Sequence, residues 1–363
     1  MNATSQPKEV MVTIPNWVGD AVMAQPALRE LRRVFYKSRI TLLARPAVAG
    51  LYEGEDVADE VILIEGRSAA FARDALLLRK KRFDLAVLLP NSFGAALLAR
   101  AAGVRRVTGY PTDRRGLLLT DAVPFDSDYK TRHQVYYYLK VASHLAASES
   151  GNDGVNPAAA AQTRLASPEP RLVVSEDQKR AARIMLASRG VGAGRPILAL
   201  NPGATNSRAK RWLPERFAEV ADRLVNRDSY QTIIVGAPGD IEAAMDTKKR
   251  MTSPSLSLAG RTTITELKRL LACCSLVISN DTGAAHVSAA LGVPAVAIFG
   301  PTEHFSTRPL SRKAMVIRRD VECSPCMLRD CPIDHRCMTG VEVDEVYRAA
   351  RALTAAEIRE PLG

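Results

Sequence analysis

The strongest constraint on the fold is one strand–turn–helix–turn–strand unit near the carboxyl-terminal third of the chain. An apolar run at 276–279 leads to Asp281-Thr282-Gly283, and a segment of small residues follows at 284–292. A second apolar run at 295–299 then ends at another turn. Two strands that end beside one helix start form the mouth of a parallel sheet, where α/β proteins bind ligands.

The chemistry of this mouth favours a phosphorylated ligand. A helix start presents unsatisfied backbone N–H groups and the positive end of the helix dipole, both of which suit a phosphate. The glycine turn and the small residues after it leave room for such a group, and Asp281 lies beside it. A phosphate site next to an aspartate indicates a nucleotide-linked substrate.

The same alternation of strand and helix patterns extends along the chain. Apolar runs predict strands, and apolar residues at helical spacing predict helices; Pro26 should kink the first helix or mark its first turn. The predicted strands are 10–14, 40–43, 61–64, 85–89, 197–200 and 232–235, and the predicted helices are 21–36, 176–188, 214–225, 264–272 and 343–353. We therefore expect an α/β protein with two Rossmann-like, doubly wound parallel sheets.

A change of composition divides the chain. Residues 146–170 are rich in Ala, Ser, Gly and Asn and show no apolar period, so we expect a loose linker there. The first domain is then 1–170 including this linker, and the second is 171–345. The remaining helix, 346–363, is expected to pack back on the first domain. Two such domains should face a central cleft.

Composition limits the class of protein. No stretch approaches the roughly 18 apolar residues of a membrane span, and the polar start shows no signal peptide, so we expect a cytoplasmic protein. The net charge of +11 is spread over both halves rather than gathered in one arm. It indicates either solvated helix faces or attraction to an anionic substrate or membrane surface. Only 5% of residues are aromatic, which argues against nucleic-acid binding.

Three polar positions follow predicted strands. Asp20 comes just after the first strand, where it either caps the next helix or acts as a general base. The loop 201–213 contains Thr205 and Lys210, natural partners of phosphate, although a polar surface loop remains the alternative. The segment 236–242 ends another strand and offers acids for ribose hydroxyls.

Five stretches together resemble the heptosyltransferases of lipopolysaccharide core synthesis, which are family-9 glycosyltransferases of GT-B architecture. They run across most of the chain, and they are Trp17-Val18-Gly19-Asp20, Leu89-Pro90-Asn91-Ser92-Phe93, Asn201-Pro202-Gly203-Ala204 with Lys210-Arg211-Trp212, Asn280-Asp281-Thr282-Gly283 with His286, and Phe299-Gly300-Pro301-Thr302. The first two are most similar to the members that add the second heptose. The resemblance implies inverting transfer of L-glycero-D-manno-heptose from ADP-heptose to the first heptose of the inner core.

The resemblance also implies roles for single residues, with no cofactor needed for catalysis. Asp20 would deprotonate the acceptor hydroxyl. The donor diphosphate would bind Thr205, Lys210 and the backbone of Thr282-Gly283. Asp281 would hold the donor heptose, with His286 supporting that turn. Either Asp240 or Glu242 would bind the ribose. The acceptor, heptosyl-Kdo-lipid A at the inner face of the cytoplasmic membrane, would meet Asn91 and Ser92.

Other polar groups leave alternatives open. Arg114 and Arg115 either grip anionic groups of the acceptor or are surface arginines. Arg132, His133 and the tyrosines 136–138 either line the acceptor side or pack in a helix. Asp126-Ser127-Asp128 spells the acid pair of metal-dependent glycosyltransferases, but it lies in a polar connection rather than at a strand end.

Four cysteines gather near the carboxyl terminus. Cys323, Cys326, Cys331 and Cys337 lie within fifteen residues, with His335 among them. A structural metal, free thiols and disulfides are all compatible with this spacing, which is not the usual pair of Cys-x-x-Cys units.

Competing functions are a transferase for the first or third heptose, a sugar epimerase of similar fold, and a non-catalytic protein that binds anionic glycolipid. A Rossmann dehydrogenase is disfavoured because no predicted strand is followed by Gly-x-Gly-x-x-Gly.

Overall fold

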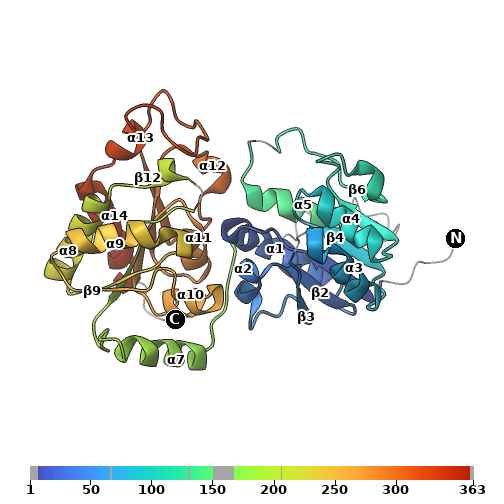
Figure 1. The fold of residues 1–363 in the computed structure, drawn as a ribbon, viewed down its shortest axis with the longest axis horizontal. Helices are drawn as coiled ribbons and strands as arrows, with labels where there is room; N and C mark the ends of the chain where they lie inside the picture. The colour runs from blue at the N-terminus through green and yellow to red at the C-terminus, as the bar shows by residue number, and fades with distance from the viewer. Residues whose placement is uncertain (1–6, 66–67, 130, 150–166, 206, 360–363) are drawn as a thin grey trace. The chain divides into compact units, whose positions relative to one another are not determined.

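The computed structural model describes residues 7–65, 68–129, 131–149, 167–205 and 207–359. Contacts between Cα atoms divide the chain into two compact units, Met1–Pro170 and Arg171–Gly363. Each unit contains one parallel sheet with helices packed beside it (Figure 1). The α/β architecture expected from the alternating pattern is confirmed.

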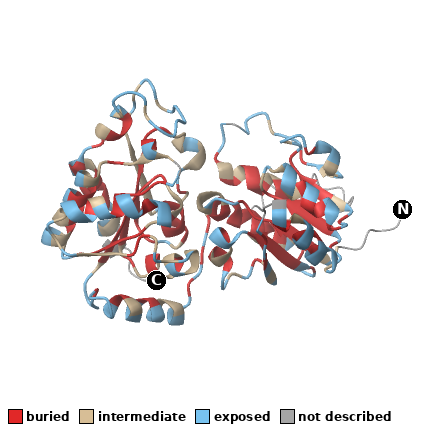
Figure 2. Ribbon diagram, in the orientation of Figure 1, coloured by how far each residue is buried: buried red, intermediate tan, exposed pale blue. Residues whose placement is uncertain are grey.

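In the first unit the described strands form a six-stranded sheet in the order β3-β2-β1-β4-β5-β6. The central strands are apolar and fully buried, because helices on a parallel sheet leave no strand face open to water (Figure 2). The strands are β1 (Glu9–Thr13), β2 (Arg39–Ala44), β3 (Glu60–Leu63), β4 (Leu85–Leu88), β5 (Arg106–Gly109) and β6 (Asp121–Ala122).

Helix α1 (Val18–Val34) follows β1 and packs along α5 (Gln134–Glu149). Pro26 lies inside α1 and is buried, so it does not mark the first turn of the helix. The other helices and 3₁₀ turns of this unit are α2 (Pro46–Ala49), η1 (Gly50–Tyr52), η2 (Ser68–Ala70), α3 (Phe71–Arg79), α4 (Phe93–Ala101) and η3 (Gly116–Leu118).

The second unit repeats this arrangement. Its described strands form a six-stranded sheet in the order β12-β11-β10-β7-β8-β9, again with parallel pairing. The strands are β7 (Ile197–Asn201), β8 (Gln231–Ile234), β9 (Ser255–Ser257), β10 (Leu276–Asn280), β11 (Ala295–Phe299) and β12 (Ala314–Arg318). Its helices and 3₁₀ turns are α7 (Glu176–Ala187), η4 (Arg208–Lys210), α8 (Pro214–Asp228), η5 (Pro238–Asp240), α9 (Ile241–Arg250), α10 (Ile264–Leu271), α11 (Gly283–Ala290), α12 (His304–Thr307), α13 (Arg336–Thr339) and α14 (Val343–Arg359).

Two expectations about connections need correction. The carboxyl-terminal helix α14 packs against α8 and the strands β10, β11 and β12, so its described side chains belong to the core of the second unit and not to the first. Residues 146–149, expected in the linker, are the last turn of α5, because α5 continues to bury apolar side chains such as Leu145. The rest of the expected linker, 150–166, lies outside the described residues.

In both units the strand order reverses at one place, and this positions the candidate site. The chain builds β1, β2 and β3 in one direction and then crosses to β4 on the other side of β1. It does the same with β7, β8 and β9 before crossing to β10. Ligands of open α/β sheets bind at the carboxyl ends of strands where the order reverses. We call these two places the first and second mouth. No helix within the described ranges is long and apolar enough to cross a membrane.

Candidate active site

Asp281 is the central side chain of the second mouth. It follows β10 and is 8% exposed, and its backbone N–H donates to the Ile298 carbonyl of β11 at 3.0 Å. Its Oδ2 accepts hydrogen bonds from Lys210 Nζ at 2.8 Å and from Thr302 Oγ1 at 2.7 Å. Lys210 and Asp281, which are 71 residues apart in the sequence, therefore form one ion pair at the edge of the sheet.

The loop that carries Lys210 is held at both ends. Asn280, the last residue of β10, donates from Nδ2 to the carbonyls of Pro202 and Gly203 at 2.8 and 3.2 Å. Its Oδ1 accepts from the backbone N–H of Trp212 at 3.0 Å. Trp212 is fully buried and donates from Nε1 to the Val341 carbonyl at 3.0 Å. Both ends of the loop are thus fixed at the second mouth, while Thr205 and Arg208 between them are exposed.

Thr282 joins β10 to α11. Its Oγ1 accepts from Asn201 Nδ2 at 2.9 Å and lies 2.9 Å from Ser279 Oγ. It is the N-cap residue of α11, but its side chain does not cap the helix. Because the hydroxyl is bound to Asn201 and Ser279, a phosphate here would meet backbone N–H groups of Thr282 and Gly283. His286 lies one turn further along α11 and is buried.

Asp240 and Glu242, the two candidates for ribose, differ in their surroundings. Asp240 is 4% exposed; its Oδ2 accepts from the Ala237 N–H at 3.0 Å and from Thr205 Oγ1 at 3.5 Å, while its enclosed Oδ1 has no hydrogen-bond partner in the described structure. A Cβ on Gly203 would lie 2.1 Å from Asp240 Cγ, so glycine is required for this close approach. Glu242 is exposed in the first turn of α9.

Asp20 lies in the first turn of α1, at the first mouth, and is partly exposed. Trp17 is the N-cap residue of this helix, and no side chain caps it, so Asp20 is not the cap that the alternative interpretation required. Asp20 Oδ1 accepts a hydrogen bond from Tyr138 Oη of α5 at 3.0 Å. Burial and the negative charge of Asp20 hold the pKa of Tyr138 well above its ordinary value, so the phenol remains a donor.

The expectation for Arg115 needs correction, because this arginine is fully buried. Its guanidinium donates to the carbonyls of Tyr110, Pro90 and Ser92, and to Asn91 Oδ1 at 3.3 Å. Burial lowers the pKa of Arg115 below its ordinary value. The residue therefore supports the loop after β4 from inside and does not face an acceptor.

The other acceptor-side candidates lie around that loop. Asn91 is exposed, and its Oδ1 also accepts from Thr112 Oγ1 at 2.9 Å and from Tyr137 Oη at 2.8 Å. Ser92 is the N-cap residue of α4, where its Oγ accepts from the Ala95 N–H at 3.3 Å. Arg114 is exposed, with a φ of 57°, and is available to an anionic ligand.

The acid pair Asp126 and Asp128 is matched by cations of the same unit. Asp126 lies 2.7 Å from Lys140 Nζ, and Arg132 lies within 4.0 Å of both carboxylates. His133 is buried, and its Nδ1 accepts from the Val135 N–H at 3.2 Å. These contacts explain the cluster as an ion-pair network at the start of α5.

The cysteine segment, residues 321–339, borders the loop that carries Lys210. The Arg329 carbonyl accepts from the Ala209 N–H at 2.9 Å, and His335 Nε2 lies 2.6 Å from the Ala209 carbonyl. A cavity of about 70 Å³ is lined by all four cysteines, Cys323, Cys326, Cys331 and Cys337. All four are free thiols, and burial raises the pKa of Cys337 to about 11. Within the described part of the chain, no three His, Cys, Asp or Glu side chains are already arranged around one ion.

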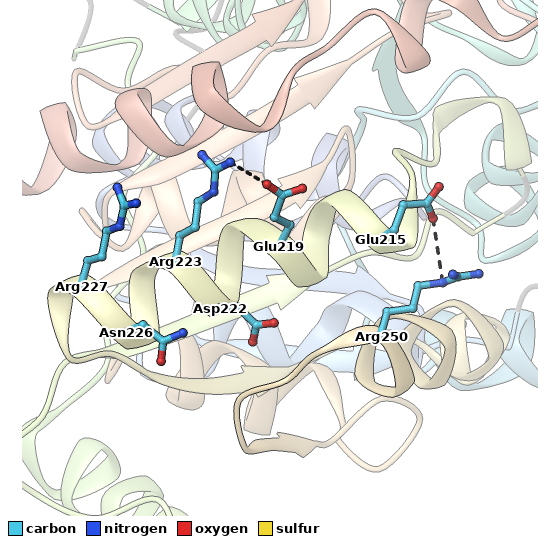
Figure 3. Close-up of a pocket in the computed structure, with 7 residues that line it drawn as sticks. All are labelled: Glu215, Glu219, Asp222, Arg223, Asn226, Arg227 and Arg250. Atoms are coloured by element: carbon cyan, nitrogen blue, oxygen red, sulfur yellow. Dashed lines mark hydrogen bonds and ion pairs between the residues drawn. The ribbon is translucent and has the colours of Figure 1, made fainter.

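A larger pocket, of about 540 Å³, lies along α8 and contains no strand-end residue (Figure 3). Four of its charged side chains pair with one another: Arg223 with Glu219 at 2.6 Å, and Arg250 with Glu215 at 3.8 Å. We place one candidate site in each unit, at its mouth, and none at this pocket, because the mouths present polar groups at the ends of central strands. The pocket is lined by Glu215, Glu219, Asp222, Arg223, Asn226, Arg227 and Arg250.

Three contributors to the second mouth were not predicted as site residues: Asn201, Asn280 and Thr302. In the first mouth, Tyr138 was named only as one of the tyrosines 136–138, with helix packing as the alternative, and its contact with Asp20 was not predicted. Asn201 and Asn280 carry a usable signal, because each is an amide that ends a fully buried strand. Buried amides must find hydrogen-bond partners, so such positions indicate a loop held from beneath. Thr302 carries no comparable signal.

Comparison with known proteins identifies close relatives. The model of glycosyltransferase family 9 (heptosyltransferase) matches residues 73–336. Lipopolysaccharide heptosyltransferase 2 of Salmonella typhimurium is 33% identical over 320 residues, covering 85% of this chain and 88% of that protein. Lipooligosaccharide heptosyltransferase 2 of Campylobacter jejuni is 28% identical over 355 residues, with 95% and 98% covered. The solved structure of Escherichia coli ADP-heptose lipopolysaccharide heptosyltransferase II matches with a TM-score of 0.81 at 29% identity, covering 96% and 99%.

Proposed function

The chain belongs to glycosyltransferase family 9, the heptosyltransferases, and from this premise we infer how its two mouths divide one reaction. The protein is an ADP-heptose-dependent glycosyltransferase of GT-B fold that adds the second heptose of the lipopolysaccharide inner core. The observation that carries the assignment is the similarity to heptosyltransferases 2 over most of both chains. The assignment of residues to steps is our proposal.

In the proposed reaction, Asp20 is the general base of the first mouth. A hydroxyl of the acceptor heptose attacks the anomeric carbon of the donor, and its proton passes to the Asp20 carboxylate. The new carbon–oxygen bond forms as the bond between the anomeric carbon and the ADP oxygen breaks, so the configuration inverts. Base assistance of this kind contributes about 10²- to 10⁴-fold to a rate.

The second mouth is proposed to hold the donor and stabilise the departing ADP. Lys210 supplies a positive charge, and the start of α11 supplies N–H groups that are not capped by Thr282. Both interact more strongly with the diphosphate as negative charge develops on it. Thr205 adds a hydroxyl, Asp281 holds the heptose with His286 as support, and Glu242 is the more accessible ribose candidate because Asp240 is enclosed.

The acceptor is proposed to meet the first mouth through Asn91, Ser92 and Arg114. Large apolar side chains are exposed near the same strand ends: Trp17 at 60%, Phe93 at 44% and Leu117 at 98%. The Phe93 N–H donates to Asp113 Oδ2 at 3.1 Å, which ties the loops that follow β4 and β5 together. Apolar and basic groups on one edge suit contact with the inner face of the cytoplasmic membrane, where the lipid-linked acceptor lies.

The cysteine segment is proposed to bind a structural, thiophilic metal ion that is separate from catalysis. Four thiols around one small cavity are the ligand type that such ions prefer, although the thiols must move closer together to share one ion. Elemental analysis of the purified protein tests the proposal. About one equivalent of metal, lost in the Cys323→Ser/Cys326→Ser double variant, is the expected result, and a metal-free, folded protein would contradict it.

The function is tested by incubating the protein with ADP-heptose and core acceptors of defined length and weighing the products. We expect one added heptose on an acceptor that carries a single heptose. Transfer to the heptose-free acceptor, or only to one that carries two heptoses, would instead identify the first or third step. Binding of acceptor without any product would indicate a glycolipid-binding protein.

A further inference from the structure

Helix α5 brings two neighbouring tyrosine hydroxyls to the first mouth. Tyr138 Oη donates to Asp20 Oδ1 at 3.0 Å, and Tyr137 Oη donates to Asn91 Oδ1 at 2.8 Å. We propose that α5 is the positioning element of the acceptor side: Tyr138 orients the base Asp20, and Tyr137 orients Asn91 as a specificity-determining contact to the acceptor sugar. This inference rests on the proposed function and extends it to residues that have no role there.

Tyr138 has the properties of a positioning residue. Its side chain is 4% exposed, so it is held by the packing of α5 along α1 and does not itself reach solvent or substrate. Asp20, in contrast, is partly exposed and accessible to a hydroxyl. A hydrogen bond from a rigid donor restricts the rotation of the carboxylate. Proton transfer requires the base and the hydroxyl within about 2.6–3.2 Å, so this orientation matters for the rate.

The contacts of Asn91 define which way its amide points. Thr112 Oγ1, Tyr137 Oη and the Arg115 guanidinium all surround one atom, Oδ1, at 2.9, 2.8 and 3.3 Å. A guanidinium can only donate, so the atom that it meets must be the amide oxygen and not the nitrogen. With the oxygen occupied, the NH₂ group of this exposed residue is directed away from its three partners. Two N–H donors fixed in this way suit the hydroxyl oxygens of a sugar.

Arg115 contributes to the same orientation from below. It is fully buried and also donates to the carbonyls of Pro90 and Ser92, on both sides of Asn91 in the chain. Thus backbone and side chain of Asn91 are held by one guanidinium. A specificity contact gains from such fixation, because less conformational freedom is lost when the sugar binds.

Tyr138→Phe tests the first half of the proposal. We expect kcat to fall about tenfold, because the hydrogen bond that orients the charged Asp20 carboxylate is lost. The ADP affinity and the melting temperature should stay near those of the wild type. The matched control is Tyr52→Phe: Tyr52 is also buried, and its hydroxyl donates to the α1 backbone at Ala21, the residue after Asp20, at 2.9 Å. This control loses a similar bond to the same helix and should keep its kcat.

A double-mutant cycle separates positioning from simple stabilisation. In an Asp20→Asn background, Tyr138→Phe should change the residual rate by less than about twofold, because residues that act as a unit are not additive. A full tenfold loss in that background would overturn the inference for Tyr138, as would wild-type kcat in the single variant. If Asp20→Asn itself remains fully active, the proposed base is wrong; that result is distinct from a failure of the tyrosine.

The second half is tested by acceptor affinity. Tyr137→Phe should raise the KM for the acceptor about threefold to tenfold with little change in kcat or in ADP affinity, and the effect should vanish in an Asn91→Ala background. Tyr136→Phe, on the same helix but next to Arg132, is the control and should leave the acceptor KM unchanged. An unchanged acceptor KM in Tyr137→Phe, or an equal rise in the Asn91→Ala background, would overturn the inference for Tyr137.

Discussion

The two mouths share one topology but are built on opposite principles. In the second mouth the polar side chains satisfy each other: Lys210 pairs with Asp281, Thr302 donates to the same carboxylate, and Asn201 donates to Thr282. In the first mouth the polar side chains Asp20 and Asn91 are partly or fully exposed and are held from behind by α5.

This difference indicates different demands on the two sites. A diphosphate that binds to Lys210 must compete with the 2.8 Å ion pair to Asp281, so donor binding exchanges one charge partner for another. A ligand that replaces Asp281 as the partner of Lys210 must itself be negative, so a diphosphate should bind better than a neutral ligand. In the first mouth the described contacts of Asp20 and Asn91 are hydrogen bonds from neutral hydroxyls and one buried guanidinium, and no ion pair of these two side chains is among the described contacts. Substitutions in the first mouth should therefore act on turnover or acceptor affinity, and those in the second mouth should first act on donor binding.

The largest expected effect is on turnover in the first mouth. Asp20→Asn should keep the fold and the affinity for ADP while lowering kcat by about 10²- to 10⁴-fold, because the proton acceptor is lost. Steady-state kinetics and calorimetric titration with ADP measure the two quantities. Asp128→Asn, which removes an exposed carboxylate of the same unit outside the mouth, should remain active. Near-wild-type transfer by Asp20→Asn would exclude it from the mechanism.

The next effect concerns donor binding in the second mouth. Lys210→Ala should weaken ADP binding about 10- to 100-fold and slow transfer as well, because a charge-assisted contact is lost in both the bound and the transition state. Calorimetry gives the affinity. The control Lys179→Ala removes an ammonium that pairs with Glu176 on α7, away from the mouth, and should bind ADP normally. Unchanged affinity in Lys210→Ala would place the diphosphate elsewhere.

A smaller effect is expected for Thr302, which donates to the same Asp281 carboxylate as Lys210. Thr302→Val removes the 2.7 Å hydrogen bond to Asp281 but keeps the shape of the side chain. Loss of one hydrogen bond should reduce donor affinity about threefold to tenfold. Thr302→Ser retains the hydroxyl and should recover most of that affinity. If Thr302→Val and Thr302→Ser have the same donor affinity, the hydrogen bond to Asp281 has no part in donor binding.

The fold was predictable where the chain is both buried and locally regular. The central strands β1, β4, β7, β10 and β11 are apolar runs, because helices cover them, and the predicted runs lie within a residue of the observed bounds. The strands β6, β9 and β12, only partly buried, were not predicted. The interior strand β5 was also missed, because its four residues Arg-Val-Thr-Gly do not form an apolar run. Strands at the edge of a sheet lack the continuous apolar run that identifies a buried parallel strand.

The places of the candidate site residues in the fold were predictable, but the contacts that hold them were not. Strand ends located Asp20, Asp281 and Thr282, because side chains after parallel strands gather at one edge of a sheet. The pair of Tyr138 with Asp20 joins residues 118 positions apart, and the burial of Arg115 depends on carbonyls more than twenty residues away. Such contacts arise only from tertiary packing. For the same reason the packing of the carboxyl-terminal helix α14 on α8 and on the strands β10, β11 and β12 was not predicted.

The smallest expected effect is that of metal removal, and it tests whether the first mouth works by oriented protein groups alone. Turnover should persist in excess EDTA for as long as the protein stays folded. Asp126 and Asp128, the acid pair of the first unit, are already matched by Lys140 and Arg132 and lie outside the mouth. The melting temperature must be followed in parallel, because a metal ion held by the cysteine segment would stabilise the loop of Lys210 and its loss would lower activity through unfolding. Lost turnover with an unchanged melting temperature, restored by Mg²⁺ or Mn²⁺ but not in Asp126→Asn, would assign a catalytic metal to this acid pair. Turnover would then depend on a bound charge in the first unit as well as in the second mouth.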